Sequence, residues 1–163
     1  MCSGKTRVGR ELAALMGRMH IDLDRVIEKR VGPLVPFFAK EGEAAFRSIE
    51  QEVLGELVQE RDAIISTGGG TTMIGDNLQS MMKAGTVVWL DVPMQALMPR
   101  IERAGGDRPL LFGLKGEALH QRVKELLAER EDTYAKAHMI VQAADDPQAV
   151  AARIKSALDL QAR

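Results

Sequence analysis

The chain has 163 residues, of which 45% are hydrophobic and 28% charged, and its formal net charge is −1. This size and composition predict one folded domain, 1–163, and argue against an intrinsically disordered chain. The balanced charge gives no support to nucleic-acid binding through a general basic surface, so we expect anions to bind only at local sites. A single cysteine excludes a disulfide framework and indicates a reducing compartment. No apolar run reaches the ~18 residues of a membrane span and no signal peptide is recognisable, so we expect a cytoplasmic protein without membrane partners.

The sequence SGKT at 3–6 matches the end of the phosphate-binding pattern G-x-x-x-x-G-K-[ST]. A helix directly behind it would direct N–H groups and the positive end of its dipole at a phosphate. Lys5 would then contact the outer phosphates of a nucleotide, and the Thr6 hydroxyl would bind Mg²⁺. The first glycine of the pattern and the strand that leads into the loop are not among residues 1–163, and truncation, a misassigned start methionine or omitted residues all stay open as explanations. The alternative is an ordinary exposed helix start.

Apolar residues further along the chain alternate between two periodicities. Helical spacing marks the segments 8–16, 46–57, 119–127 and 150–158. Between them lie short β-branched runs that are typical of buried parallel strands, at 63–67, 86–92 and 139–143. This alternation predicts an α/β fold with a parallel sheet and right-handed crossovers. The glycine-rich stretch 103–118 has no period, and we expect it to be a mobile loop.

Two carboxylates in the sequence HIDLD are candidates for phosphoryl-transfer chemistry. Asp22 and Asp24 are two residues apart, so in an extended segment both would project to the same side. At the carboxyl end of a strand facing a phosphate loop, one could orient magnesium-bound water and the other could accept a proton from an attacking hydroxyl. The alternative is that Asp24 caps a helix that starts near Arg25.

Arginines and glycines supply the other candidates. Arg47 in EGEAAFRSIE could grip a carboxylate through two hydrogen bonds, or could be a surface arginine paired with Glu43 or Glu50. The glycines in STGGGTT follow a predicted strand and would allow a ligand to approach the backbone closely; a flexible turn is the alternative.

Two later arginines and a lone cysteine complete the set of candidates. Arg108 lies in the predicted loop and could neutralise charge on a transferring phosphoryl group. Arg130 accompanies Tyr134 on a predicted helix, where the alternative is a solvated side chain. Cys2 has no base nearby in the sequence, which argues against nucleophilic catalysis.

In order and spacing, these motifs together resemble those of the shikimate kinase family. The matching stretches cover essentially the whole chain and are SGKTRVGRELA, IDLD, IEKRVG, FFAKEGEAAFRSIE, STGGG, VVWLDVP, DRPLL and REDTYAKAH. Members of this family transfer the γ-phosphoryl group of ATP to the 3-hydroxyl of shikimate, in the pathway to chorismate and the aromatic amino acids. The resemblance implies a three-layer P-loop NTPase fold with a central parallel sheet flanked by helices, a mobile lid at about 105–116, Mg²⁺ as cofactor and a monomeric enzyme.

The resemblance also implies roles for individual residues. Catalysis would involve Asp24 as the base for the attacking hydroxyl, together with Lys5 and Arg108. Shikimate would be bound by Asp24, Arg47, Gly68, Gly69, Gly70 and Arg130, with the two arginines on its carboxylate. ATP would be bound by Cys2, Ser3, Gly4, Lys5, Thr6, Arg7, Arg103, Arg108 and Pro147, with Arg103 and the loop 144–147 on either side of the adenine. Mg²⁺ would be held directly by Thr6, with Asp22 near it through water.

Two departures from the family pattern and two rival functions accompany this interpretation. Leu23 stands where the family often has threonine and should point away from the ligand, and the first strand and first glycine of the phosphate loop are missing. A related small-molecule kinase, such as a gluconate kinase, is one rival, which a panel of substrates would test. A binding or regulatory domain that has lost catalysis is the other, and ATP binding without turnover would favour it.

Overall fold

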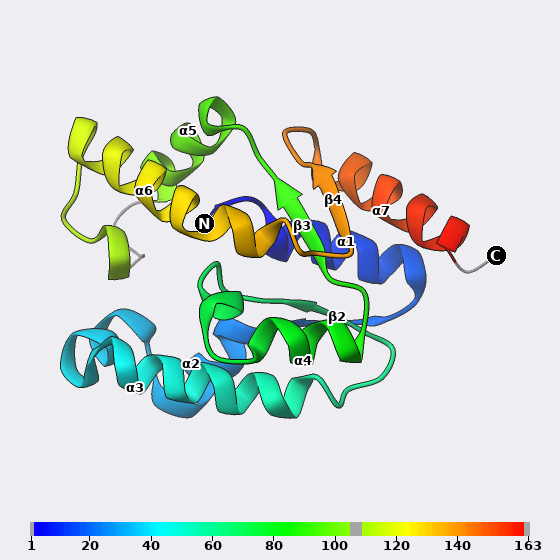
Figure 1. Cartoon of the computed structure of the whole chain (residues 1–163), viewed down its shortest axis with the longest axis horizontal. Coiled ribbons are helices and arrows are strands. Elements are labelled where there is room, and N and C mark those ends of the chain that lie inside the picture. Colours follow the sequence, from blue (N-terminus) through cyan, green and yellow to red (C-terminus); the bar gives the residue numbers. More distant parts are fainter. Residues whose placement is uncertain (1, 105–108, 162–163) are drawn as a thin grey trace.

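The computed structural model describes residues 2–104 and 109–161 and shows an α/β arrangement of helices and short parallel strands (Figure 1). The elements in chain order are α1 (Lys5–Met16), β1 (Met19–Asp22), α2 (Leu23–Val31), α3 (Leu34–Leu57), β2 (Ala63–Ser66), the 3₁₀ turn η1 (Thr71–Met73), α4 (Asn77–Ala84), β3 (Val88–Asp91), α5 (Met94–Ala104), the 3₁₀ turn η2 (Pro109–Leu111), α6 (Gly116–Tyr134), β4 (Met139–Gln142) and α7 (Pro147–Gln161). The four segments of helical spacing lie in α1, α3, α6 and α7, and the three β-branched runs contain β2, β3 and β4. These sequence predictions are confirmed.

The four strands form two parallel pairs. β1 pairs with β2, from Met19 opposite Ala63 to Asp22 opposite Ser66. β3 pairs with β4 over four positions in the same way. The pairing is parallel as predicted, but among the described residues no ladder joins β2 to β3 into one continuous sheet.

A cavity of about 270 Å³ separates the two pairs. Ile64 and Ser66 line it from β2, Val88 and Leu90 from β3, and Leu12 from α1. A phosphate loop normally follows a strand inside the sheet, and the described residues contain no strand ahead of α1. Among the described residues, the edges of β2 and β3 that face this cavity have no ladder partner.

Two apolar clusters hold the elements together. The larger one joins α1, β3, α5, η2, α6, β4 and α7 through buried residues that include Val8, Leu12, Leu97, Leu111, Val123, Val150 and Ile154. In Figure 1 this is the part where α1 and α7 lie side by side. The smaller cluster contains Leu23, Ile27, Phe46, Val53 and Leu57 and packs α2 against α3. Leu23 is fully buried in it, as expected for a side chain that points away from a ligand.

Close packing at Gly9 brings the start of α1 against β1 and β2. A Cβ atom on Gly9 would lie 2.6 Å from Ser66 Oγ and 2.8 Å from His20 Nε2, so no larger residue fits without movement. His20 Nε2 and Ser66 Oγ form a hydrogen bond at 2.9 Å. Ser66 Oγ also donates a hydrogen bond to the carbonyl oxygen of Lys5 at 3.1 Å. The beginning of α1 is thereby tied to both strands of the first pair.

The segment 103–118 is more ordered at its ends than the sequence suggested. Arg103 and Ala104 form the end of α5, and α6 begins at Gly116. Between them, η2 contacts α3 and buries Leu111. Arg108 lies outside the described residues, as do 105–107, so the predicted lid at 105–116 stays a prediction. In the described ranges, every helix is too short or too polar to cross a membrane.

Candidate active site

A cavity with a volume of about 600 Å³ is lined by many of the predicted site residues. It lies at the carboxyl ends of β1 and β2, between the α2–α3 unit and α6. Of the residues proposed from the sequence, it is lined by Thr6, Asp22, Asp24, Arg47, Gly68, Gly69, Gly70 and Arg130. Pro33, Leu34, Phe38, Phe46 and Leu110 give it an apolar wall. The fold thus gathers eight predicted residues from five separate segments.

A break in α3 shapes this wall. Gly42 has φ 83° and ψ 174°, which interrupts the helix between Leu34 and Leu57. A positive φ of this size favours glycine. The break separates the turns that carry Leu34 and Phe38 from those that carry Phe46 and Arg47, and both parts face the cavity.

The two aspartates occupy different elements, and the expectation of one extended segment is wrong. Asp22 ends β1 and is itself the N-cap of α2, where its side chain accepts a hydrogen bond from the Arg25 N–H at 3.3 Å. Asp24 lies in the first turn of α2, so the proposal that Asp24 caps the helix is also wrong. An N-cap aspartate satisfies a free backbone donor, which is why the helix begins before Asp24. Both carboxylates still reach the cavity.

The two residues predicted to hold Mg²⁺, Thr6 and Asp22, lie next to each other. Thr6 Oγ1 donates a hydrogen bond to Asp22 Oδ2 at 2.7 Å. Among the described residues no group of three or more His, Cys, Asp or Glu side chains could enclose a metal by itself. One hydroxyl and one carboxylate nevertheless fit Mg²⁺, which usually takes one or two hard protein oxygens and completes its shell with water and phosphate oxygens.

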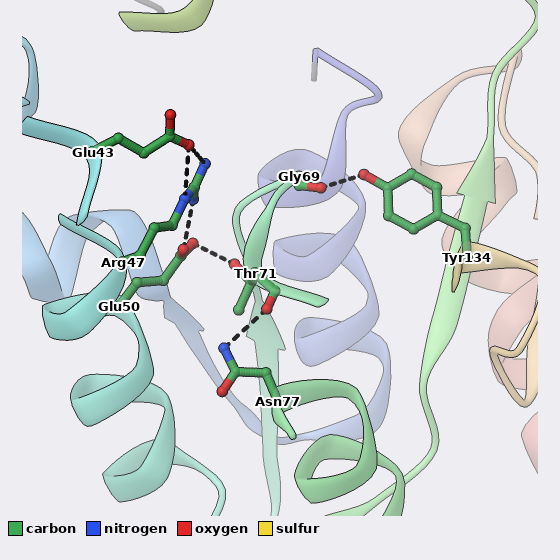
Figure 2. Close-up of polar contacts among 7 residues, drawn as sticks. All are labelled: Glu43, Arg47, Glu50, Gly69, Thr71, Asn77 and Tyr134. Atoms are coloured by element: carbon green, nitrogen blue, oxygen red, sulfur yellow. Dashed lines mark hydrogen bonds and ion pairs between the residues drawn. The ribbon is translucent and has the colours of Figure 1, made fainter. Parts of the chain in front are cut away.

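Arg47 is held by carboxylates on both sides (Figure 2). Its Nη1 donates to Glu50 Oε2 at 2.6 Å, while Nε and Nη2 donate to Glu43 Oε1 at 3.2 and 3.1 Å. Burial opposes the charged form, but hydrogen bonds and charge from Glu50 and Glu43 outweigh it and raise the pKa of Arg47. The interpretation as a surface ion pair is thus right about the partners and wrong about the surface, since the side chain is only 15% exposed. The guanidinium also lies over the Phe46 ring, 5.2 Å from its centre.

Glu50 connects Arg47 to the triple-glycine turn. It is almost fully buried, and its Oε1 accepts a hydrogen bond from Thr71 Oγ1 at 2.5 Å. The carbonyl oxygen of Thr71 accepts another from Asn77 Nδ2 at 2.9 Å. Because a buried carboxylate is costly without partners, these bonds fix the end of the turn against α3 and α4. The sequence interpretation gave Thr71 and Asn77 no role, and the spacing of Glu50 three residues after Arg47 was the only signal for this network.

At two of the three glycines of the turn, Gly68 and Gly70, side chains from other elements approach the backbone closely. A Cβ atom on Gly68 would lie 2.8 Å from Glu50 Oε1 and 3.4 Å from Asp24 Oδ1. One on Gly70 would lie 2.8 Å from Arg47 Nη2. Asp24, Arg47 and Glu50 therefore converge on the backbone of the turn, and the interpretation as a merely flexible turn is wrong.

Arg130 and Tyr134 bring α6 to the same turn. Arg130 is only 6% exposed, so the interpretation as a solvated helix residue is wrong. One helical turn later, the Tyr134 hydroxyl donates a hydrogen bond to the carbonyl oxygen of Gly69. The Tyr134 ring packs against Trp89 of β3, with ring centres 5.6 Å apart. Burial raises the pKa of the Tyr134 hydroxyl, and the charge and hydrogen bonding of Arg130 oppose that rise.

The predicted phosphate-binding residues lie beside this cavity. Gly4 is the N-cap of α1, with φ 88°, and its carbonyl oxygen accepts the N–H of Val8 at 2.9 Å. Ser3 and Lys5 line a second cavity of about 290 Å³ that also touches Gly68 and Gly69. Gly68 and Gly69 line both cavities, so the two cavities adjoin at the glycine turn.

The remaining predicted nucleotide residues are more scattered. Cys2 packs against the larger apolar cluster, and Arg7 is exposed on α1. Arg103 is exposed and donates to the Pro99 carbonyl oxygen of its own helix at 3.0 Å. Pro147 begins α7. Arg100, which the sequence interpretation missed, joins α5 to the loop 144–147 by donating to the Ala144 carbonyl oxygen at 3.2 Å.

Comparison with known proteins assigns this arrangement to a family. The family model described as "Shikimate kinase" matches residues 1–159. A shikimate kinase from Gloeobacter violaceus is 44% identical over 155 residues, which cover 93% of this chain and 84% of the relative. One from Parabacteroides distasonis is 43% identical over 144 residues, covering 88% and 83%. The chain belongs to the shikimate kinase family.

Solved shikimate kinase structures share the fold. The Acinetobacter baumannii enzyme in complex with shikimate superimposes with a TM-score of 0.91 at 34% identity, covering 99% of this chain and 89% of that one. The enzyme from Bacteroides thetaiotaomicron gives 0.88 at 32% identity, covering 98% and 94%. The predicted α/β P-loop kinase fold is therefore confirmed for this shikimate kinase family member.

Proposed function

We propose that this chain is an ATP-dependent shikimate kinase, which transfers the γ-phosphoryl group of ATP to the 3-hydroxyl of shikimate. One observation carries the proposal. A single cavity of about 600 Å³ brings together Asp24, the partly buried Arg47, the buried Arg130 and the glycine turn. Shikimate has one carboxylate and three hydroxyls, so its polar groups match this set. The likeness to a shikimate kinase in complex with shikimate supports the same substrate.

The two arginines suit the carboxylate of the substrate. A guanidinium has five N–H donors, and three hydrogen bonds from Arg47 go to Glu43 and Glu50. Two donors are left, which is the number that a bidentate carboxylate needs. Glu50 and Glu43 hold the guanidinium in one orientation before substrate arrives, so little ordering is needed on binding. We propose that Arg130, which lies on α6, binds the same carboxylate from the other side of the cavity.

Asp24 suits the role of base for the attacking hydroxyl. Its carboxylate lies against Gly68, at the edge that the cavity shares with the neighbouring phosphate side. Phosphoryl transfer depends mainly on positioning and on stabilisation of charge. An aspartate that orients the hydroxyl and takes its proton late in the transfer is sufficient for that.

The nucleotide is assigned to the N-terminal end of α1. Backbone N–H groups of residues 3–6 and the ammonium of Lys5 would bind the phosphates. Thr6 and Asp22 would hold Mg²⁺, which supplies positive charge to the phosphate oxygens when bound. Cys2, Arg7, Arg103, Arg108 and Pro147 complete the proposed nucleotide contacts, and a lid at about 105–116 stays part of the proposal.

The proposal extends to the working form of the protein. We infer a cytoplasmic, monomeric, single-domain enzyme that has no nucleic-acid or membrane partner. The single cysteine and the balanced charge support this inference.

A coupled assay of ADP release with ATP and Mg²⁺ tests the proposed function. Release should depend on shikimate and should not occur with gluconate. Turnover with gluconate alone would point to the rival kinase. ATP binding without turnover of any substrate would favour a regulatory domain and contradict the proposal.

A further inference from the structure

Tyr134 joins three elements around the glycine turn. It is the last residue of α6, packs against Trp89 of β3, and donates its hydroxyl hydrogen to Gly69 of the turn. Figure 2 shows the phenol reaching the turn from the side opposite to Arg47 and Glu50. The turn is therefore held on one side by the Glu50–Thr71 bond and on the other by Tyr134.

The bond from Tyr134 fixes the orientation of one peptide group. In a trans peptide the C=O and the following N–H point in opposite directions. Because the Gly69 carbonyl oxygen accepts the hydrogen bond from Tyr134, the N–H of Gly70 points away from Tyr134. Among the described residues no hydrogen bond from the Gly70 N–H is found. Gly70 lines the same cavity as Arg47.

The same hydroxyl lies close to the second arginine of the site. Arg130 precedes Tyr134 by about one helical turn, and its charge and hydrogen bonding act on the Tyr134 hydroxyl. Arg130 and Gly69 both line the substrate cavity, and Tyr134 connects them through α6 and its hydrogen bond to Gly69. A phenylalanine would keep the packing against Trp89 but would break this connection.

We propose that Tyr134 is a positioning residue, whose hydroxyl sets the Gly69–Gly70 peptide and Arg130 in the relative orientation that binds the substrate carboxylate. This inference rests on the proposed function. Tyr134 itself makes no contact with substrate in this proposal. Its loss should therefore weaken shikimate binding and leave the phosphoryl-transfer step and ATP binding unchanged.

The variant Tyr134→Phe tests the inference in the full chain. We expect the KM for shikimate and its calorimetric Kd to rise about 3- to 10-fold, as for the loss of one hydrogen bond. The kcat and the KM for ATP should stay within error, the Tm should fall slightly because the Gly69 carbonyl oxygen loses its donor, and hydrogen exchange of the amides at 69–71 should become faster without substrate. Ser156→Ala, which removes an exposed hydroxyl from α7, is the control and should change none of these.

The outcomes separate this inference from the proposed function. If the unmodified chain neither binds nor turns over shikimate, both are overturned. If the unmodified chain is active and Tyr134→Phe leaves the KM for shikimate unchanged, only the role of Tyr134 is overturned. An equal rise in the KM for both substrates would also overturn it, because that pattern indicates general destabilisation and no specific effect on the shikimate side.

Discussion

The substrate side and the nucleotide side of the candidate active site are built in different ways. On the substrate side, Arg47, Glu50 and Thr71 hold one another in a largely buried network. On the nucleotide side, the groups assigned to ATP include backbone N–H groups at the start of α1 and exposed side chains such as Arg7 and Arg103. Buried charges must be paired even without ligand, whereas water can satisfy exposed donors. Substitutions on the substrate side should therefore change both stability and affinity.

The largest expected effect is on the chemical step. Asp24→Asn should lower kcat by about 10²- to 10⁴-fold, because the amide cannot accept the proton from the attacking hydroxyl. Nucleotide binding should be retained, since Asp24 faces the substrate side. Steady-state kinetics and calorimetric titration with ATP check both points, with the exposed Asp62→Asn as control. A kcat close to that of the unmodified chain would leave Asp24 only a structural role.

The second effect tests whether the substrate side is part of the folded core. Glu50→Ala should lower the free energy of unfolding by about 3 kcal/mol, the lower end of the range for a broken buried pair, because Arg47 keeps Glu43. Glu56 lies on α3 like Glu50, but its ion pair with Arg30 of α2 is exposed. Glu56→Ala should therefore change the free energy of unfolding little. Urea unfolding measures both. Equal effects of the two variants would contradict the difference between buried and exposed charges.

The third effect is on substrate affinity. Arg130→Lys keeps the charge but loses the planar pair of donors. The KM for shikimate should therefore rise by a factor that corresponds to a binding free energy weaker by about 1.5–3 kcal/mol. The KM for ATP should change much less. Arg122→Lys, on the exposed side of α6, is the control. A matching rise for ATP would show that the two sides are not independent.

The smallest effect concerns the ionisation of Tyr134. Burial raises the pKa of its hydroxyl above the ordinary value of about 10, despite the opposing charge of Arg130. The folded protein thus keeps the proton longer than the unfolded chain does. The resulting stability is fully present below pH of about 10 and is lost as the pH rises through the raised pKa. The chain has one tyrosine, so tyrosinate absorbance follows this group alone, and a midpoint at or below the ordinary value would refute the prediction.

Local pattern determined much of the fold and the residue types of the site. The periodicity of apolar residues located α1, α3, α6 and α7 and the cores of β2, β3 and β4, because burial of one face imposes a repeat of 3.6 or 2 residues. The SGKT and STGGG motifs marked the phosphate side and the turn because backbone geometry there demands glycine. The spacing of Arg47 and Glu50 also indicated their pairing, since residues three apart are neighbours on a helix.

Only the tertiary structure decided how distant segments meet. The hydrogen bond from Tyr134 to Gly69 spans 65 residues, and no local repeat encodes such a contact. Arg47 and Arg130 face one cavity because α3 and α6 pack on either side of the turn. The helical place of Asp24 depends on Asp22 capping α2, and the division of the strands into two pairs depends on which edges find a partner. Sequence pattern records which residues are buried, whereas the directions in which the elements pack decide what those residues touch.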